Sequence, residues 1–270
     1  MNENYQVNRK EYQEDKKIAL NNLNNMSSQS TGRHSILKSV VLHLVPGLLA
    51  LLAYILLARP IQAAGFPSIM AWLITALFIT IPFELGYMLY QGQQLNGRLS
   101  LTKIILYRQP LKAGQIVLWT ILTFMAVTIL FIVAAPVTKL LQTTVFGWVP
   151  DWFMLDTGLE GEWSKSKLLI VNITSLFVSI IGIPIVEELY FRGYLLPRLS
   201  HLGIWAIFLS SFLFALYHFT TPWMVVSRFL FTLPLAYLAY QKKNLTLVIV
   251  IHALGNSIEV ILGFVYVLGM

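Results

Sequence analysis

The sequence has no cysteine and few charged residues for its length. Only 11% of its 270 residues are charged, whereas 57% are hydrophobic, and the mean hydropathy is +0.69. The absence of cysteine excludes disulfide bonds and thiolate metal sites. A soluble globular domain carries roughly a quarter of its residues as charged side chains, so the scarcity of charge excludes that class. The composition indicates a polytopic membrane protein, an all-α bundle of membrane helices.

An early apolar stretch is also missing. The first 35 residues are polar and of mixed charge, whereas a cleavable signal peptide needs an apolar region near its start. We expect residues 1–38 to form a flexible cytosolic tail. The net charge of +7 suggests nucleic acid at first sight, but in so apolar a chain basic residues mark cytoplasmic loops instead. No nucleic-acid partner is therefore expected.

Apolar segments long enough to cross a bilayer recur along the rest of the chain. A helix needs about 20 residues to span about 30 Å of hydrocarbon. The sequence holds seven such segments: 39–58, 69–90, 116–138, 168–197, 204–221, 223–240 and 245–268. The fold class expected is therefore a bundle of about seven transmembrane helices.

These segments predict three regions beyond the tail. N-terminal transmembrane helices occupy 39–138, an extracytoplasmic interfacial loop occupies 139–167, and a catalytic transmembrane core occupies 168–270. Trp148, Trp152 and Trp163 lie in the loop, where tryptophan is typical of the lipid headgroup level.

The basic residues predict the orientation of the bundle. With the N-terminus inside, thirteen Lys and Arg fall on the cytoplasmic side and four on the outside, with Arg192 and Arg228 in or near spans. Cytoplasmic loops carry the excess of Lys and Arg. We therefore expect a multi-pass protein of the plasma membrane whose N-terminus is cytoplasmic.

The stretch "GIPIVEELYFRGYLLPRL" keeps three ionisable groups inside an apolar helix. Each such group costs about 2.5–3.5 kcal/mol at the centre of a membrane helix, so their presence needs a function. Glu188 and Arg192 stand at i and i+4 and can pair on one face. Glu187 points about 100° away and has no basic partner at helical spacing, which leaves it free for chemistry.

Two further spans carry histidine. "FLFALYHF" places Phe214 and His218 on one helical face, and "VIHALGNSIE" places His252 and Asn256 on one face. The rise of 1.5 Å per residue puts Glu187, His218 and His252 in one band near or below mid-membrane. Such a cluster is typical of a catalytic or metal site.

The three patterns together resemble a known family. They are Glu187-Glu188-x-x-x-Arg192, Phe214-x-x-x-His218 and His252-x-x-x-Asn256, in this order on successive membrane helices. This arrangement is similar to the motifs of the CPBP (Abi) intramembrane proteases. That family includes the type II CAAX prenyl endopeptidases and bacteriocin-processing or immunity relatives. The resemblance covers about residues 168–260.

The resemblance implies hydrolysis of a peptide bond in a membrane-embedded or lipidated peptide or protein within the lipid bilayer. Glu187 would take a proton from water as general base, and His218 would hold that water and later protonate the leaving amine. His252 and Asn256 would donate hydrogen bonds to the oxyanion. Glu188, Arg192 and Phe214 would support the site structurally, with Arg192 as a possible grip on substrate.

A metal site is the alternative for the same residues. Glu187, His218 and His252 match the ligand types of catalytic zinc, although the sequence has no HExxH and the three ligands come from three helices. The family has been described both as metalloproteases and as metal-independent glutamate proteases. The metal-independent form is favoured here, so no cofactor is expected, with zinc as the alternative.

Two other functions compete with proteolysis. A non-catalytic immunity or regulatory protein of the same fold would bind a peptide, yet it has no need for Glu187 together with both histidines. A transporter would use the carboxylates as a proton relay and would predict repeat symmetry, which the sequence does not show. Glu84, near the inner end of the second span, is expected to bond to a neighbouring helix or to line a substrate path.

Overall fold

A computed structural model describes residues 32–159 and 162–269. The first 31 residues, and with them most of the predicted tail, lie outside the described residues. The described chain is helical, and its one β-type pairing is an isolated bridge between Arg108 and Asn244. The predicted all-α class is confirmed.

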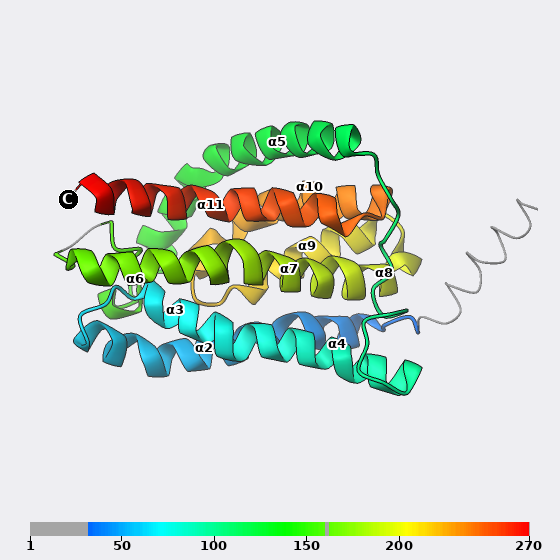
Figure 1. The fold of residues 1–270 in the computed structure, drawn as a ribbon, viewed down its shortest axis with the longest axis horizontal. Coiled ribbons are helices and arrows are strands. Elements are labelled where there is room, and N and C mark those ends of the chain that lie inside the picture. The colour runs from blue at the N-terminus through cyan, green and yellow to red at the C-terminus, as the bar shows by residue number, and fades with distance from the viewer. Residues whose placement is uncertain (1–31, 160–161, 270) are drawn as a thin grey trace, which may run out of the picture. The chain divides into compact units, whose positions relative to one another are not determined.

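Within the described residues, ten α-helices form the bundle (Figure 1). They are α2 (Ile36–Ala63), α3 (Ile69–Thr75), α4 (Ile81–Asn96), α5 (Ala113–Leu140), α6 (Lys165–Ser175), α7 (Ile183–Glu187), α8 (Leu196–Arg198), α9 (Trp205–Tyr217), α10 (Val225–Lys242) and α11 (Leu245–Gly269). Wider π-helical turns join several of these into longer helices: Ala76–Thr80, Leu176–Gly182 and Glu188–Leu195, with Leu141–Val145 extending α5.

Six helices of the described chain are long and apolar enough to cross a membrane. They run over Ile36–Ala63, Ile69–Asn96, Ala113–Val145, Lys165–Arg198, Pro222–Lys242 and Leu245–Gly269. The remaining predicted span, 204–221, is the shorter apolar helix α9 of 13 residues. At 1.5 Å per residue it rises about 20 Å, which is less than the hydrocarbon thickness of about 30 Å. The protein is thus a polytopic bundle with one short helix.

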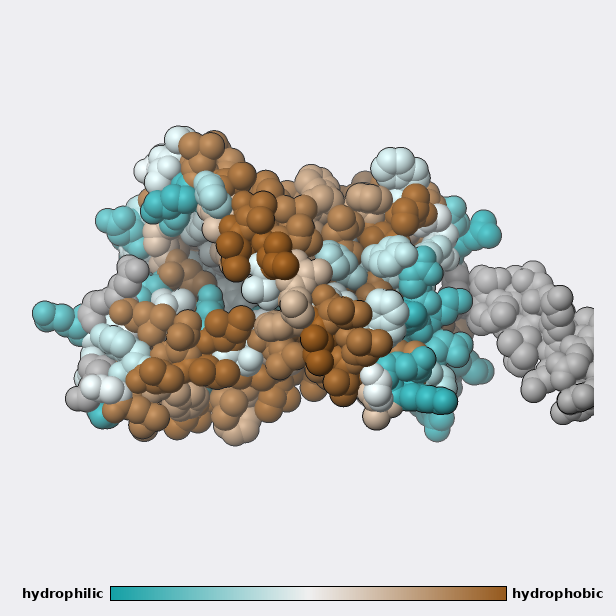
Figure 2. Space-filling view, turned by 90° about the horizontal axis from the view of Figure 1, so that it is seen from above, coloured by the Kyte–Doolittle hydropathy of each residue, from teal (hydrophilic) through white to brown (hydrophobic). Residues whose placement is uncertain are grey.

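Apolar side chains cover much of the outer surface between the two ends. Figure 2 shows this band in brown, with hydrophilic residues gathered towards both ends. Leu56, Ile132 and Val265 are typical of the band, with exposed fractions of 74%, 65% and 64%. In water such a surface would be unfavourable, whereas in a bilayer these side chains face lipid.

The loop between α4 and α5 closes one end of the bundle. Its residues Ile104, Ile105 and Tyr107 are buried in the main apolar core. Arg198 donates to the carbonyl oxygens of Tyr194 and Ile104 at 2.7 and 3.3 Å, and the backbone N–H of Gln109 donates to the Lys243 carbonyl at 2.8 Å. Three loops that were predicted to share the cytoplasmic side therefore meet at one end; the side of the membrane stays a prediction.

The helix α5 extends further than its hydropathy predicted. It continues as a π-helical turn through Val145, so the connecting loop begins at Phe146 rather than at residue 139. The hydroxyls of Thr143 and Thr144 donate to the Lys139 and Leu140 carbonyls at 3.0 and 2.6 Å. Both hydroxyls thus bond back to carbonyls one turn earlier in the same helix, a common arrangement for threonine within helices.

Gly47 allows α2 to approach the end of α9. A Cβ atom added at Gly47 would lie 2.0 Å from the Tyr217 carbonyl oxygen and 2.8 Å from its ring. The side chain of Tyr217 is buried, so this close approach fixes the position of a buried tyrosine as well as that of a helix.

We predict that Gly47→Ala lowers the free energy of unfolding by about 1–3 kcal/mol, because overpacking a tight contact has that cost. The matched control is Gly86→Ala on α4, where an added Cβ has nothing within 4 Å and where alanine favours the helix. Thermal unfolding in detergent measures both. Equal melting temperatures for the two variants would contradict the close contact.

Candidate active site

The helix Lys165–Arg198 contains two π-helical turns close to the charged residues of the first motif. One turn covers Leu176–Gly182 and the other Glu188–Leu195; such widened turns are frequent at functional sites. The predicted pair is nevertheless formed: Arg192 Nη1 donates to Glu188 Oε1 at 3.1 Å. Both side chains are fully buried.

Glu188 also holds His252, which the sequence did not indicate. His252 Nδ1 lies 2.9 Å from Glu188 Oε1. Since an ionised carboxylate only accepts hydrogen bonds, the proton of this bond lies on Nδ1. The other ring nitrogen, Nε2, then faces Glu187 Oε2 at 4.0 Å. One carboxylate therefore orients the histidine towards the other.

Glu187 differs from its neighbour in its surroundings. It is buried, and its Oε1 accepts a hydrogen bond from the Tyr217 hydroxyl at 3.1 Å. Its Oε2 is buried and has no hydrogen-bond partner among the described residues. The oxygen that faces His252 is thus left without a protein donor.

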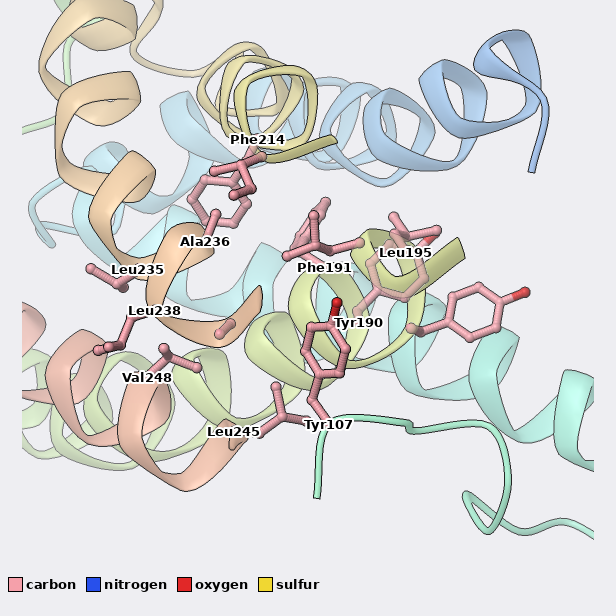
Figure 3. Packing of buried hydrophobic residues seen from close by; sticks show 14 of the residues in the cluster. Tyr107, Tyr190, Phe191, Leu195, Phe214, Leu235, Ala236, Leu238, Leu245 and Val248 are labelled. Carbon is pink, nitrogen blue, oxygen red and sulfur yellow. The ribbon is translucent and has the colours of Figure 1, made fainter. Parts of the chain in front are cut away.

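Phe214 connects the three motifs through its ring. The guanidinium carbon of Arg192 lies 4.1 Å from the ring centroid, a cation–π contact. The rings of His218 and His252 lie 4.9 and 6.5 Å from it, and Phe191 packs edge-on at 4.8 Å. Figure 3 shows Phe214 and Phe191 within the packed core. The aromatic residue of the second motif therefore supports the cation of the first.

His218 and Asn256 stand at the rim of this cluster. His218 directly follows α9, and its Nδ1 donates to the Phe214 carbonyl at 2.9 Å. Asn256 Nδ2 donates to the Ser179 carbonyl at 2.8 Å. Ser179 belongs to the π-helical turn Leu176–Gly182, so Asn256 fixes α11 against that turn. Both side chains are half-buried.

Tyr217 is a residue of this site that sequence reasoning missed. It is buried, it donates to Glu187, and it interacts electrostatically with Glu84. The available signal was a tyrosine hydroxyl beside a motif histidine in a helix otherwise composed almost entirely of apolar and small residues. That pattern predicts a buried polar contact without naming its partner.

The predicted zinc ligands do not form a metal-binding group in this geometry. Within residues 32–159 and 162–269, no three His, Asp or Glu side chains gather closely enough to hold a metal ion. The Nδ1 atoms of His218 and His252 are engaged by the Phe214 carbonyl and Glu188. No chemical step is therefore assigned to a metal.

We predict that Arg192→Met destabilises the protein by about 3–5 kcal/mol, because it removes one partner of a buried ion pair. Adding Glu188→Gln to this variant recovers part of the loss, since the remaining group is then neutral. Lys165→Met, at an exposed position, is the control and changes stability little. Thermal unfolding in detergent of the two single variants and the double variant completes a double-mutant cycle. Additive effects of the two substitutions would contradict a coupled pair.

One stretch of the chain, which carries the three motifs, matches a family model. Residues 169–258 match the family model described as Type II CAAX prenyl endopeptidase Rce1-like. No curated protein and no solved structure matches the chain. The matched segment contains all three motifs and thus the whole cluster around Glu188, so the resemblance to the CPBP family is confirmed. Over residues 169–258 the chain is therefore similar to the Rce1-like type II CAAX prenyl endopeptidase family.

Proposed function

We propose that the protein is an intramembrane endopeptidase that hydrolyses a peptide bond in a membrane-embedded or lipidated peptide or protein. One observation carries the proposal. A buried carboxylate oxygen without a hydrogen-bond partner, Glu187 Oε2, faces the Nε2 atom of a histidine at 4.0 Å. Glu188 orients that histidine through its other nitrogen at 2.9 Å.

The space between these two atoms suits a nucleophilic water. A water oxygen can lie within hydrogen-bond distance of both Glu187 Oε2 and His252 Nε2, because the two atoms are 4.0 Å apart. Glu187 would take the proton from this water as it attacks the peptide carbonyl carbon. The Tyr217 hydroxyl, bonded to Oε1, leaves Oε2 to receive the proton.

His218 is suited to the departure of the amine. Its Nδ1 donates to the Phe214 carbonyl, so in the neutral ring Nε2 is the nitrogen that accepts a proton. A proton taken up there would pass to the leaving nitrogen as the carbon–nitrogen bond breaks.

His252 and Asn256 would stabilise the oxyanion. Asn256 uses one amide hydrogen for the Ser179 carbonyl and keeps a second to donate. His252, whose Nδ1 is bonded to Glu188 at 2.9 Å, would donate the second bond from Nε2 when both ring nitrogens carry a proton. Removing one oxyanion donor typically costs about 2.7–4 kcal/mol in the transition state.

The setting of the reaction follows from the multi-pass fold. The substrate would reach the site from the lipid bilayer, and the proposed location is the plasma membrane with the N-terminus in the cytoplasm, as the distribution of Lys and Arg predicts. A membrane-associated substrate agrees with the family of the matched segment.

The first experiment compares native membranes that express the protein or its Glu187→Gln variant at matched levels. The amide keeps the shape and the Tyr217 contact but cannot act as a base. We expect new peptide termini only with the unmutated protein, and about a 10²–10⁴-fold slower cleavage of any identified substrate by the variant. Mass spectrometry of termini measures this.

The control is Asp151→Asn, an exposed carboxylate in the loop after α5, which should leave cleavage unchanged. Identical termini with and without Glu187, from a folded protein, would contradict proteolysis. That outcome would favour the non-catalytic immunity or regulatory protein that binds a peptide.

Cleavage should also survive removal of divalent metals, because the described residues provide no three-ligand group for one. The measurement is the rate of substrate cleavage after treatment with a strong zinc chelator and dialysis, followed by zinc addition. A rate that falls on chelation and returns with zinc would contradict the metal-independent mechanism.

A further inference from the structure

Glu84 is a buried carboxyl that the mechanism above does not use. It lies in the first turn of α4, which packs against α7 and the π-helical turn Glu188–Leu195. Its side chain has no exposed surface, and neither oxygen has a hydrogen bond of full geometry with a described residue. An unpaired ionised carboxylate in such a place costs several kcal/mol.

The groups around Glu84 belong to the catalytic cluster. The charged and titratable groups that face it are Glu187, Glu188 and Arg192, with the hydroxyls of Tyr190 and Tyr217. The hydroxyl of Tyr217 interacts with two carboxyl groups. It donates to Glu187 Oε1 at 3.1 Å, and it interacts with the carboxyl of Glu84.

The charges of the residues around Glu84 indicate which of the three carboxyl groups holds a proton. Glu188 accepts from both Arg192 and His252, so it is the anion of the ion pair. Glu187 must be ionised to take a proton from water, a step that rests on the proposed function. Arg192 is the only cation facing Glu84 among the described residues. A third ionised carboxylate would add like charge without a partner, and such clusters retain a proton.

We propose that Glu84 is a positioning residue whose protonated carboxyl donates a hydrogen bond to the Tyr217 oxygen and so directs the Tyr217 hydroxyl to Glu187. The chain runs from Glu84 O–H to the Tyr217 oxygen, and from Tyr217 O–H to Glu187 Oε1. Each proton stays on its own oxygen, so the chain consists of hydrogen bonds alone. Consecutive hydrogen bonds of this kind polarise and strengthen one another.

This arrangement explains why Glu187 presents Oε2 to His252. A tyrosine hydroxyl can rotate about its C–O bond. If no donor is bonded to its oxygen, its hydrogen can point in another direction. The bond from Glu84 fills the acceptor position of the hydroxyl, so its hydrogen is left for Glu187 Oε1. The second oxygen of Glu187 then faces His252 and the attacking water.

Infrared spectroscopy of the purified full chain tests the proton on Glu84 without any substrate. The unmutated protein should show the C=O stretch of a protonated carboxylic acid, and Glu84→Gln should remove that band. Tyr217→Phe should shift it, because the hydrogen-bond partner is lost. Asp151→Asn, outside the membrane helices, is the control and leaves the band in place. A band unchanged by Glu84→Gln, or no such band, overturns the proposal.

Kinetics on a cleaved peptide test the positioning role. Glu84→Gln keeps a neutral donor and should retain kcat within about threefold, whereas Glu84→Ala should lower kcat by about 10- to 100-fold with little change in KM. Tyr217→Phe should cause a similar loss, and the double variant Glu84→Ala/Tyr217→Phe should be no worse than either alone.

The two proposals fail in different ways. Independent losses that multiply in the double variant, or a Glu84→Ala enzyme with unchanged kcat, would overturn the role of Glu84. If the unmutated protein and Glu187→Gln release the same termini, the proposed function fails, while the infrared band still decides whether Glu84 holds its proton.

Discussion

The arrangement of the site depends on a single carboxylate oxygen. Oε1 of Glu188 accepts hydrogen bonds from Arg192 at 3.1 Å and from His252 at 2.9 Å. Burying this carboxylate is unfavourable unless its charge is compensated. The folded bundle therefore has to bring both donors into contact with it. Arg192 comes from the same helix and His252 from α11, and Arg192 in turn stacks on Phe214 of α9. The ion pair therefore ties three elements to one point, and it sets the distance from His252 to Glu187.

Two adjacent carboxylates can take different roles because a helix points successive side chains about 100° apart. Glu188 turns towards the cation and the histidine, whereas Glu187 turns towards Tyr217 at the end of α9. The end of α9 can lie there because α2 has glycine at residue 47, where a Cβ would meet the Tyr217 carbonyl. The close approach of α2 to the backbone of Tyr217 thus helps to place the hydroxyl that reaches Glu187.

Contacts within one helix could be predicted from the sequence, and contacts between helices could not. The i, i+4 spacing of Glu188 and Arg192 predicted their ion pair, and the same spacing placed Phe214 beside His218. Hydropathy located the spans, with the largest difference at the end of α5, which continues through the π-helical turn Leu141–Val145. The bonds of Glu188 to His252 and of Tyr217 to Glu187 depend on how α9 and α11 pack, which no local spacing encodes. The catalytic roles of the motif residues stay predictions.

The short helix α9 leaves irregular backbone beside the site. The proposed hydrolysis would consume water, and irregular backbone at membrane depth is tolerated only where protein buries it or where it lines a water-filled cavity. The chain leaves α9 at Tyr217, after a rise of about 20 Å, and continues through irregular residues to Pro222. Internal contacts satisfy part of this segment: the Thr221 N–H donates to the His218 carbonyl at 3.1 Å, and Arg228 donates to the Thr221 carbonyl at 3.1 Å. Trp223 packs against Phe146 from the end of the extended α5. A full-length span in place of α9 would carry regular helix past His218, and the polar break beside Glu187 and His252 would be lost. The shortness of this helix is therefore what places a polar break beside Glu187 and His252, where the proposed reaction would need one.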